Sequence, residues 1–411
     1  MATYRRTHPW LTFALNTEKA PGRLWLALGE ARSKCDHLAG IPLKPNIAMK
    51  LHEVYLAKGV HATAAIEGNT LNQQQVLERI EGKGQLPQSQ EYLGKEIDNI
   101  LDAANGIMDR VSKRGFTPIT VDDIENYNAT ILRGLELEEY VEPGKTRKID
   151  VGVMDYKAPA AAESDELLRR LCEWLNSTDF KPPNEDDSIV SGIIKAIVAH
   201  IYIAWIHPFG DGNGRTARLL EVRFLMEAGV PSAAVHLLSN HYNITRSDYY
   251  RRLSEASKNG GDLNNFFQYA VRGFVDQLRQ QLRVVKYQQW ELAWESYVYE
   301  KFGEKRTSTT RRQLALILAL SEKNKPVARS ELRRINPKVA ELYAGKTSKT
   351  LSRDLNALRK RKLISVLPEG IRPNKEIILA FLPDARAGGL EAQLKESAAL
   401  IDEAGQLIFG F

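Results

Sequence analysis

Apolar residues recur every three or four positions along most of this chain, which is the spacing of one face of an α-helix. The first clear example runs from Ile47 towards Gly68, with Gly59 as a predicted interruption and Gly68-Asn69 as a stop signal. Further helices are predicted from Asn72 and over residues 93–108, 263–282 and 284–302. The hydrophobic pattern therefore predicts an all-α core.

The most apolar helix is predicted to begin at Ser188. Its apolar positions recur every four residues, at Ile189, Ile193, Ile197, Ile201 and Trp205. Apolar neighbours widen this face, which indicates a helix buried at the centre of a bundle. Pro208 disfavours a helical conformation at His207, so this histidine is expected at the exit of the helix. A second helix is predicted from about Arg215 to Gly229.

Two segments depart from the helical period. Pro143-Gly144 is a turn signal followed by alternating β-prone residues, which predicts a short hairpin over residues 141–153. In the C-terminal region, the predicted order is helix, short helix, helix and hairpin, over residues 313–321, 330–335, 347–362 and 363–381. This order matches a winged helix-turn-helix.

The composition is that of an ordinary globular protein of two or three domains, with 411 residues, 43% hydrophobic and 26% charged. Cys35 and Cys172 have neither a disulfide nor a zinc spacing, which favours a reducing, cytoplasmic location. No uninterrupted apolar stretch is expected to span a bilayer, and the N-terminal residues lack an apolar core of signal-peptide length. We therefore expect no membrane partner.

The net charge of +6 is unevenly distributed along the chain. Residues 305–362 contain 17 Lys and Arg against 4 Asp and Glu, a balance of +13, which leaves −7 for the remainder. Such a basic region favours an anionic partner, most simply nucleic acid. A solvated helical surface is the commoner explanation of a charge run taken alone.

Residues 207–218 read His-Pro-Phe-Gly-Asp-Gly-Asn-Gly-Arg-Thr-Ala-Arg. The turn Gly212-Asn213-Gly214 can aim successive backbone N–H groups at one point and opens directly into a helix N-terminus. Both features favour an anion. Arg215 and Arg218 share a face of the following helix and add bidentate donors for phosphate oxygens.

The same stretch contains two groups suited to phosphate chemistry. Asp211 is a candidate ligand for Mg²⁺, whose other ligands would be phosphate oxygens and water. His207 is the nearby group whose ordinary pKa suits proton abstraction at neutral pH. A histidine at a helix end, a glycine turn and an aspartate cap are each commonly structural when they occur alone. Their conjunction within twelve residues favours a nucleotide site.

Residues 207–218 resemble the motif of the Fic family of protein adenylyltransferases, His-x-Phe-x-Asp/Glu-Gly-Asn-Gly-Arg-x-x-Arg, and match it without a gap. The resemblance extends to residues 199–206 before the motif and to Ser247-Asp248-Tyr249-Tyr250 after it. It implies a Fic-type helical bundle with a β-hairpin flap. It also implies transfer of AMP from ATP to a Tyr, Thr or Ser hydroxyl of a target protein or of the chain itself.

The resemblance assigns roles to the motif residues. His207 would deprotonate the hydroxyl that attacks the α-phosphate, and Asp211 would hold Mg²⁺ as the cofactor. Arg215 and Arg218 would neutralise the β- and γ-phosphates. The backbone amides of residues 212–214, with Asn213, would cradle the phosphates.

Further assignments rest on the same resemblance. The hairpin after Pro143-Gly144 resembles the Fic flap, which registers a target segment by strand addition, with residues Val151, Val153, Met154, Asp155 and Tyr156. Tyr249 and Tyr250 are candidates for flanking the adenine, although tyrosines at this spacing are more often part of a core. A homodimer is implied by the resemblance alone.

A second motif, Thr63-Ala64-Ala65-Ile66-Glu67-Gly68-Asn69, resembles the family's inhibitory pattern, Ser/Thr-x-x-x-Glu-Gly/Asn. Glu67 lies at a predicted helix C-terminus, where the helix dipole disfavours negative charge unless a cation compensates it. The resemblance implies that Arg218 is this cation and that the pair blocks the γ-phosphate position. In some relatives the same glutamate directs water to remove AMP.

The non-enzymatic alternative is a DNA-binding transcriptional regulator whose Fic domain serves in autoregulation or in AMP removal. The exposed face of its predicted recognition helix includes Ser348, Lys349, Ser352 and Arg353. Winged helices also dock proteins, and the sequence leaves these two choices open.

The sequence thus predicts five parts. They are an N-terminal helical region with the inhibitory helix, a Fic catalytic core, a linker helix, a winged helix-turn-helix and a helical tail, over residues 1–110, 111–282, 283–305, 306–385 and 386–411.

Overall fold

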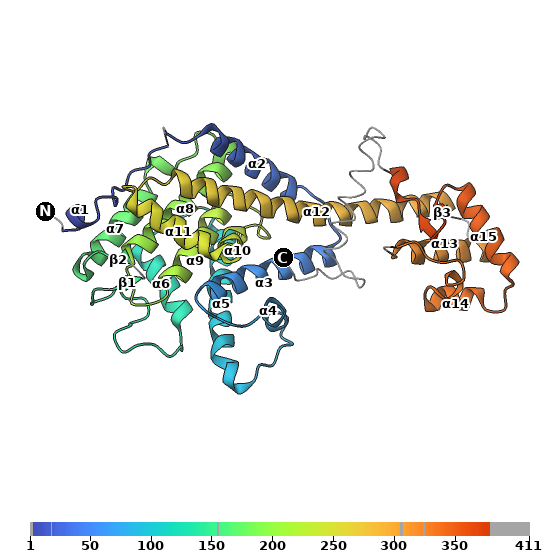
Figure 1. The fold of residues 1–411 in the computed structure, drawn as a ribbon, viewed down its shortest axis with the longest axis horizontal. Helices are drawn as coiled ribbons and strands as arrows, with labels where there is room; N and C mark the ends of the chain where they lie inside the picture. The colour runs from blue at the N-terminus through green and yellow to red at the C-terminus, as the bar shows by residue number, and fades with distance from the viewer. Residues whose placement is uncertain (1–2, 18, 154–155, 305–306, 324, 379–411) are drawn as a thin grey trace. The chain divides into compact units, whose positions relative to one another are not determined.

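The computed structural model describes residues 3–17, 19–153, 156–304, 307–323 and 325–378. It divides the chain into an N-terminal unit, Met1–Gln280, and a C-terminal unit, Gln281–Phe411 (Figure 1). The tail predicted over residues 386–411 lies outside the described residues. The other four predicted parts stay predictions, since no boundary other than that between the two units is defined.

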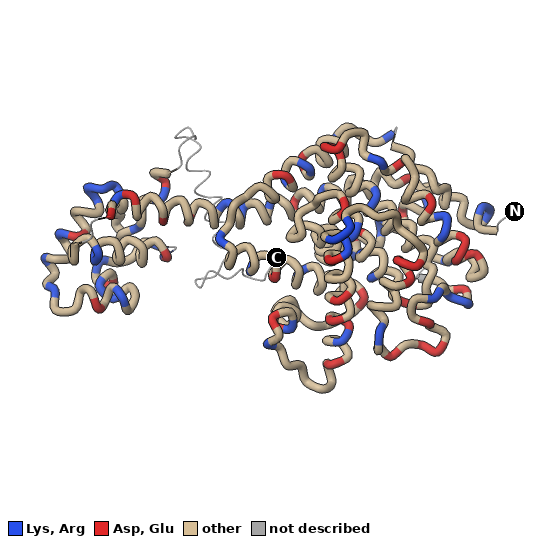
Figure 2. Tube along the Cα trace, turned by 180° about the vertical axis from the view of Figure 1, so that it is seen from behind, with Lys and Arg blue, Asp and Glu red and all other residues tan. Residues whose placement is uncertain are grey.

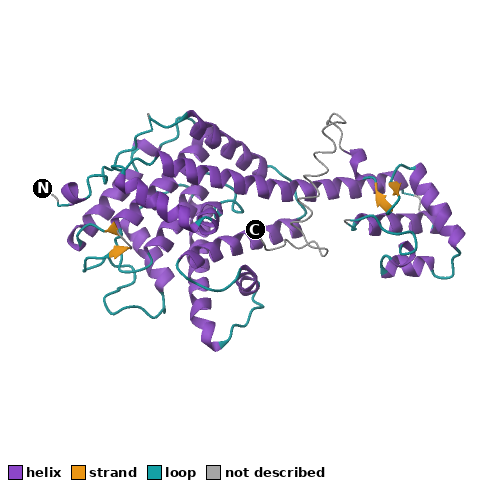
Figure 3. Cartoon of the chain, in the orientation of Figure 1, coloured by secondary structure: helices purple, strands orange, loops and turns teal. Residues whose placement is uncertain are grey.

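Helices form most of the N-terminal unit, and loops connect them (Figure 3). At its centre, α8 (Ser188–Ile206) packs along α9 (Asn213–Glu227). The surrounding helices are α1 (Tyr4–Thr7), α2 (Gly22–Ala39), α3 (Pro45–Ile66), α4 (Gln73–Ile80), α5 (Glu91–Arg114), α6 (Val121–Leu132), α7 (Ser164–Leu175), α10 (Leu237–Ile244), α11 (Arg246–Lys258) and the first part of α12 (Asn264–Phe302). The expectation of a mostly helical fold is confirmed.

The central helix α8 is the most apolar helix among the described residues. Among the described residues, the segment Glu185–Ile206 is long and apolar enough, by length and composition, to cross a membrane. However, 83% of its most apolar window is buried inside the protein. This burial is what a helix with apolar residues around its whole circumference requires at the centre of a bundle.

Two helices are longer than predicted. The two segments expected over residues 263–282 and 284–302 form one helix, α12, because no glycine or proline occurs between Gly273 and Gly303 to end it. Helix α3 also continues through Gly59 to Ile66, so the predicted interruption is wrong. Gly59 instead lets a neighbouring side chain approach, since a Cβ built there would lie 2.3 Å from the Cβ of His236.

Gly59→Ala is therefore expected to lower the free energy of unfolding by about 1–3 kcal/mol, because the added methyl group overpacks a filled contact with His236. The higher helix propensity of alanine relative to glycine acts in the stabilising direction, by about 1 kcal/mol. The matched control is Gly29→Ala in α2, where no atom lies within 4 Å of the added group and a gain of about 0.5–1 kcal/mol is expected. Chemical denaturation followed by circular dichroism measures both, and equal responses would contradict the packing argument.

The N-terminal unit contains one short antiparallel hairpin among its described residues, made of β1 (Gly152–Val153) and β2 (Tyr156–Lys157). Gly152 pairs with Lys157, and Val153 pairs with Tyr156. The hairpin predicted over residues 141–153 is thus displaced towards the C-terminus. Residues 141–151 form turns and loop, because Arg147 in this segment is held by carbonyl groups of other segments.

The C-terminal unit has its own apolar core, to which the last turns of α12 contribute Trp294, Val298 and Phe302. Around them lie α13 (Ser308–Ser321), α14 (Pro337–Tyr343), α15 (Ser348–Lys360), β3 (Ile364–Leu367) and β4 (Gly370–Pro373). Strands β3 and β4 are antiparallel, with Ile364 opposite Pro373. Both strands lie within residues 363–381, where the sequence predicts a hairpin.

One helix of the C-terminal unit was misplaced by the sequence pattern. The short helix expected over residues 330–335 is a single 3₁₀ turn, Leu332–Arg334, and the α-helix begins at Pro337. Asn336 accepts a hydrogen bond from the N–H of Val339 at 2.8 Å, and proline suits the first helical position. This capping arrangement fixes the start of α14.

Candidate active site

The loop between α8 and α9 turns sharply twice. His207 ends α8 in the left-handed conformation, with φ 48°, and Gly212 precedes α9 with φ 76°. Asn213 is buried, and its side chain holds both backbone groups of Phe209: it accepts from the N–H at 3.0 Å and donates to the carbonyl at 2.9 Å. The side chain of Asn213 therefore shapes the loop through both of its polar atoms.

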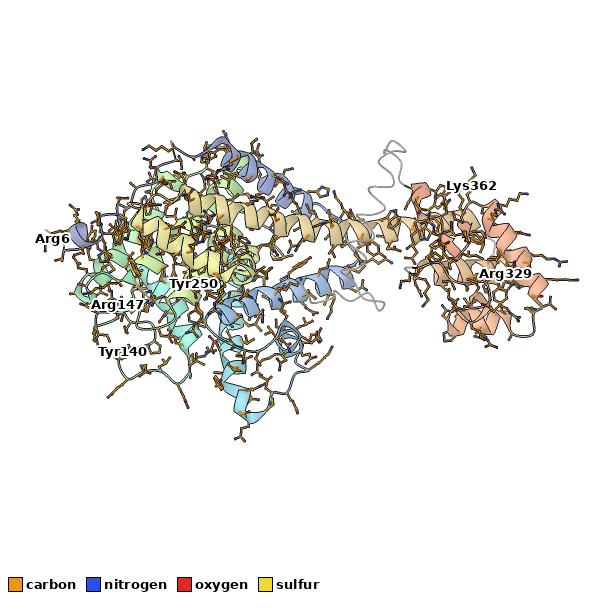
Figure 4. All side chains as sticks on the ribbon, viewed as in Figure 1. Arg6, Tyr140, Arg147, Tyr250, Arg329 and Lys362 are labelled. Carbon is orange, nitrogen blue, oxygen red and sulfur yellow. The ribbon has the colours of Figure 1, made fainter. Side chains whose placement is uncertain are left out.

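Arg147 fixes the loop from outside it (Figure 4). Its fully buried guanidinium donates from Nε to the carbonyl of His207 at 2.8 Å and from Nη2 to the carbonyl of Pro159 at 2.5 Å. Its backbone N–H donates to the carbonyl of Pro208 at 2.8 Å. A left-handed histidine is strained, and these bonds hold it in place.

Asn128 of α6 supports the glycine turn. It donates to the carbonyl of Asp211 at 2.9 Å and accepts from the N–H of Gly144 at 3.0 Å. A Cβ at Gly212 would lie 2.9 Å from the Asn128 amide nitrogen, so glycine is required there for space as well as for its positive φ. Sequence reasoning missed Asn128, because nothing in the local pattern links it to a loop 83 residues away.

Seven of the predicted site residues line one cavity of 210 Å³ in the N-terminal unit, whereas Asp211, Gly212, Arg215 and Arg218 are not part of its lining. Its lining includes His207, Glu67, Gly214, Tyr249 and Tyr250. The backbone of the glycine turn and the imidazole therefore face the same space, which is the arrangement needed by a bound phosphate chain beside a base.

His207 is neutral at pH 7 in this environment. Burial lowers its pKa to about 4, while a hydrogen bond with the backbone of Ala204 and the charges of Glu67 and Asp211 oppose this effect. Arg147 adds to the lowering. A neutral imidazole has a free lone pair and can accept a proton.

Glu67 ends α3 and reaches across the cavity to α9. Its Oε1 accepts a hydrogen bond from Arg218 Nη2 at 2.5 Å, and the same Nη2 donates to the carbonyl of Thr63 at 2.9 Å. Burial by itself would raise the pKa of Glu67, but the charge and hydrogen bond of Arg218 and the charges of Arg215 and Arg246 outweigh it and lower the pKa. Glu67 is therefore ionised and paired.

The Glu67 carboxylate also covers the glycine turn. A Cβ built at Gly214 would lie only 2.3 Å from Glu67 Oε1 and 3.1 Å from Arg218 Nη1. The carboxylate thus occupies space directly against the start of α9, where an anionic ligand of the turn would lie. Arg218 is almost fully buried, and its Nε and Nη1 have no hydrogen-bond partner in the described structure.

Arg215 has different partners from Arg218. Its Nη1 donates to Glu96 Oε1 on α5 at 2.5 Å, and its Nη2 contacts Asp211 Oδ1 at 3.1 Å. Glu96 in turn accepts from the side chain of Asn69, the last residue of the inhibitory motif, at 2.8 Å. Glu96 was not predicted, and it ties Arg215 to the segment that contains Glu67.

Tyr249 and Tyr250 line the cavity in different ways. Tyr249 is buried, and its hydroxyl contacts His200 Nε2 at 2.8 Å, so only its ring can face a ligand. His200 Nδ1 lies 3.0 Å from Oε1 of the buried Glu221. Tyr250 is half-buried and donates to the carbonyl of Ile66 at 3.4 Å. The rings of Tyr249 and Tyr250 both line the cavity, so the suggestion that they flank the adenine stays a prediction.

The candidate flap is partly described. Val151 precedes β1, and Tyr156 of β2 donates its hydroxyl to the carbonyl of Trp205 at 2.7 Å, next to the exit of α8. Met154 and Asp155 lie outside the described residues, and Val153 is described by its backbone pairing alone.

Residues 118–225 match the model of the Fic/DOC family. The matched segment contains the whole loop from His207 to Arg218 together with Asn128 and Arg147. The part of the chain that matches the Fic/DOC family therefore lies within the N-terminal unit.

Particular relatives carry more specific names. "Protein adenylyltransferase Fic" of Nematostella vectensis is 31% identical over 252 residues, which cover 60% of this chain and 53% of the relative. "Protein adenylyltransferase fic-1" of Caenorhabditis elegans is 30% identical over 213 residues, which cover 52% of this chain and 38% of the relative. The chain thus spans about half or less of the length of these curated relatives.

Two solved structures share the fold. A Fic family protein from Desulfovibrio desulfuricans G20 matches with a TM-score of 0.53 and 20% identity, covering 87% of this chain and 97% of that one. Fic-1 (residues 134–508) from C. elegans matches with a TM-score of 0.52 and 24% identity, covering 64% of this chain and 73% of that one. Both likenesses concern the fold alone.

Proposed function

We propose that this protein transfers AMP from ATP to hydroxyl groups of Tyr, Thr or Ser in target proteins, and to its own hydroxyls. The observation that carries the proposal is that His207, Asn213 and Gly214 line one cavity together with Glu67, whose carboxylate pairs with Arg218. The names of the curated relatives support the same activity.

In the proposed reaction, neutral His207 takes the proton from the target hydroxyl as its oxygen attacks the α-phosphorus. A new P–O bond forms, the bond between the α-phosphorus and the bridging oxygen breaks, and pyrophosphate leaves. The N–H groups at the start of α9 bind the phosphate oxygens, and Arg218 offers its unpartnered Nε and Nη1 to the departing charge. His207 returns its proton to solvent after the transfer.

Mg²⁺ fits this site through a single carboxylate. The Asp211 side chain is about half exposed, with 48% of its surface accessible, and can share an ion with phosphate oxygens and water. No group of three or more acidic, histidine or cysteine ligands occurs in the described parts of the chain, so the protein alone does not form a complete metal site. When bound, the ion would neutralise phosphate charge.

Glu67 is proposed to inhibit the reaction. Its carboxylate forms an ion pair with the guanidinium of Arg218 and fills the space over Gly214. The γ-phosphate of ATP would need both this guanidinium and this space. ATP bound beside this carboxylate would hold its phosphates out of line for attack. Removal of AMP by water directed from Glu67 is the alternative use of the same residue.

A labelled-ATP experiment tests the proposed activity directly. The purified chain is incubated with cell lysate and ATP labelled either at the α- or at the γ-phosphate. Protein-bound label from α-labelled ATP alone is the expected result, because the γ-phosphate leaves in pyrophosphate. Label from γ-labelled ATP alone, or from neither even when Glu67→Gly replaces the wild type, would contradict AMP transfer.

The pH dependence of transfer should reflect the buried histidine. Because the pKa of His207 is lowered to about 4, the rate is expected to fall only as the pH drops towards 4, and not near the ordinary value of 6.5. Initial rates between pH 4.5 and 8 measure this, with circular dichroism at each pH. The folded state loses stability below pH 6.5, since the unfolded chain binds the proton more readily. A midpoint near 6.5 in folded protein would argue against His207 as a buried base.

A second candidate function belongs to the C-terminal unit, which we propose to be a winged helix that binds DNA. Lys and Arg recur along this unit (Figure 2). On α15, Ser348, Lys349 and Arg353 are exposed, and β3–β4 supplies a hairpin in the position of a wing. Ser352 is half-buried and bonded to Arg329 (labelled in Figure 4), so it is the least available of the four predicted contacts. Protein docking is the alternative.

Replacing both Lys349 and Arg353 with alanine is expected to weaken duplex DNA binding by about tenfold or more, because each removes a charge-assisted phosphate contact. Arg311→Ala, at the exposed first turn of α13, is the matched control and should change binding little. Mobility shifts at 50 and 200 mM salt measure both affinity and its salt dependence. No shift of the wild type at low salt would favour protein docking.

A further inference from the structure

A second cavity of the N-terminal unit, with a volume of 620 Å³, lies against the other face of α11. Asp248 and Arg252 of α11 line this cavity, whereas Tyr249, Tyr250 and Leu253 line the candidate active site. The remaining walls come from α2, the end of α10 and the first turns of α12. The cavity is large enough for a small-molecule ligand.

Three guanidinium groups from three different helices meet at this cavity. Arg23 of α2, Arg252 of α11 and Arg272 of α12 all line it, and none makes a hydrogen bond or an ion pair with another described residue. The two carboxylates of the lining are compensated by arginines outside it, through the pairs Asp248–Arg251 at 2.5 Å and Asp276–Arg279 at 2.7 Å. The lining therefore has three guanidinium groups against two carboxylates, of which Asp248 also feels the charge of Arg252.

Two buried polar atoms of the lining also have no partner within the described structure. They are Nε of Arg252 and Nε2 of His241. The imidazole lies directly on Gly273, where an added Cβ would be 2.1 Å from His241 Cδ2. An unpaired buried polar atom destabilises a fold, and a ligand that hydrogen-bonds to it removes that cost.

The start of α2 adds a further anion-binding feature. This helix of 18 residues begins at Gly22, so Arg23 lies in its first turn, beside backbone N–H groups that have no partner within the helix. The positive end of the helix dipole reinforces the charge of the arginines.

We propose that this cavity binds an anion with two or more phosphate groups. Guanidinium groups on separate helices can each bind a different phosphate oxygen pair, which a single small carboxylate cannot satisfy. Neither the Fic motif nor the cavity at His207 contributes a residue to this site.

The location on α11 links this site to the candidate active site. Arg246, in the first turn of α11, donates to the carbonyls of Ala65 and Ile66 at the end of α3, next to Glu67. An anion that ties α11 to α2 and α12 would hold Arg246 on α3 and so reinforce the inhibited arrangement. This consequence rests on the proposed function, whereas the binding site does not.

Calorimetric titration of pyrophosphate into the full chain tests the site. Arg23→Ala and Arg252→Ala are each expected to weaken binding by about tenfold, because each removes a charge-assisted contact. Arg114→Ala, at the exposed end of α5, is the matched control and should bind like the wild type. Arg23 is itself exposed, so its variant should fold normally; circular dichroism checks every variant.

Several outcomes would overturn the proposal. The first is that the wild type does not bind pyrophosphate at about 1 mM. The second is that Arg23→Ala and Arg252→Ala bind pyrophosphate as tightly as the control. Loss of binding in Arg218→Ala would place the anion in the candidate active site instead. Citrate that binds as tightly as pyrophosphate would contradict the preference for phosphate, whereas tighter binding of ADP than of pyrophosphate would identify a nucleotide.

Hydrogen exchange distinguishes the site from its consequence. With pyrophosphate present, backbone amides 63–67 of the wild type should exchange more slowly, and those of Arg252→Ala should not. Unchanged exchange despite binding would overturn the link to Glu67. Neither measurement depends on AMP transfer, so a failure of the proposed activity would be recognised separately.

Discussion

Glu67→Gly should raise the rate of AMP transfer by about 5- to 150-fold, the range of a typical coupling between two sites. The substitution removes the carboxylate that pairs with Arg218 at 2.5 Å and that fills the space over Gly214. Arg218 would then be free for the phosphates of ATP. Incorporation of α-labelled AMP into protein, measured as an initial rate, gives the effect.

The chain contains a matched control for this variant. Glu322 ends α13 as Glu67 ends α3, but it is exposed, and its side chain makes no hydrogen bond or ion pair with a described residue. Glu322→Gly should therefore leave the transfer rate unchanged. If Glu67→Gly behaved in the same way, Glu67 would not be an inhibitory residue.

His207→Ala should lower the rate of AMP transfer by about 10²- to 10⁴-fold, the usual contribution of a general base. The effect is best measured in protein that already contains Glu67→Gly, because the uninhibited rate leaves room for a large decrease. ATP affinity should change little, since the phosphates are held by the turn and by Arg218. Labelled-AMP transfer and calorimetry measure the two quantities separately.

The exposed His37 near the end of α2 provides the control, and His37→Ala should keep the full rate. A rate for His207→Ala within about threefold of its parent would exclude a proton-transfer role for the imidazole. A loss of ATP binding in the same variant would instead indicate that His207 supports the shape of the loop.

The sequence predicted best those features that depend on neighbours along the chain. The four-residue repeat from Ile189 to Trp205 identified the central helix, and Pro208 identified its end, because both act within one or two turns. The glycine turn was identified for the same reason. Glu67 was found through a local motif, and the helix-dipole argument required a cation that the geometry supplies in Arg218.

The sequence did not predict contacts between distant segments. Asn128, Arg147 and Glu96 hold the loop or its arginines from positions 60 to 119 residues away in the chain, and single polar residues in helices or loops give no periodic signal. The shared face of Arg215 and Arg218 was foreseen, but their separate partners depend on how α3 and α5 pack against α9.

The error at α12 has a simple physical origin. Separate apolar runs were taken as two helices, although nothing between Leu282 and Val284 can break a helix. The second helix of the C-terminal unit was misplaced because the apolar positions before residue 336 were used to locate it. Its start is instead determined by the N-cap Asn336 and by Pro337 at the first helical position.

The missing side chain of Gly214 has a consequence for how this protein can vary. The Glu67 carboxylate uses the room that any larger residue at position 214 would need, so two positions 147 apart in the chain are sterically coupled. A relative with alanine at position 214 would need a shorter side chain at position 67, or a different position of that side chain. The loss of the Glu67–Arg218 pair and a change in the glycine turn that binds phosphate would then occur together.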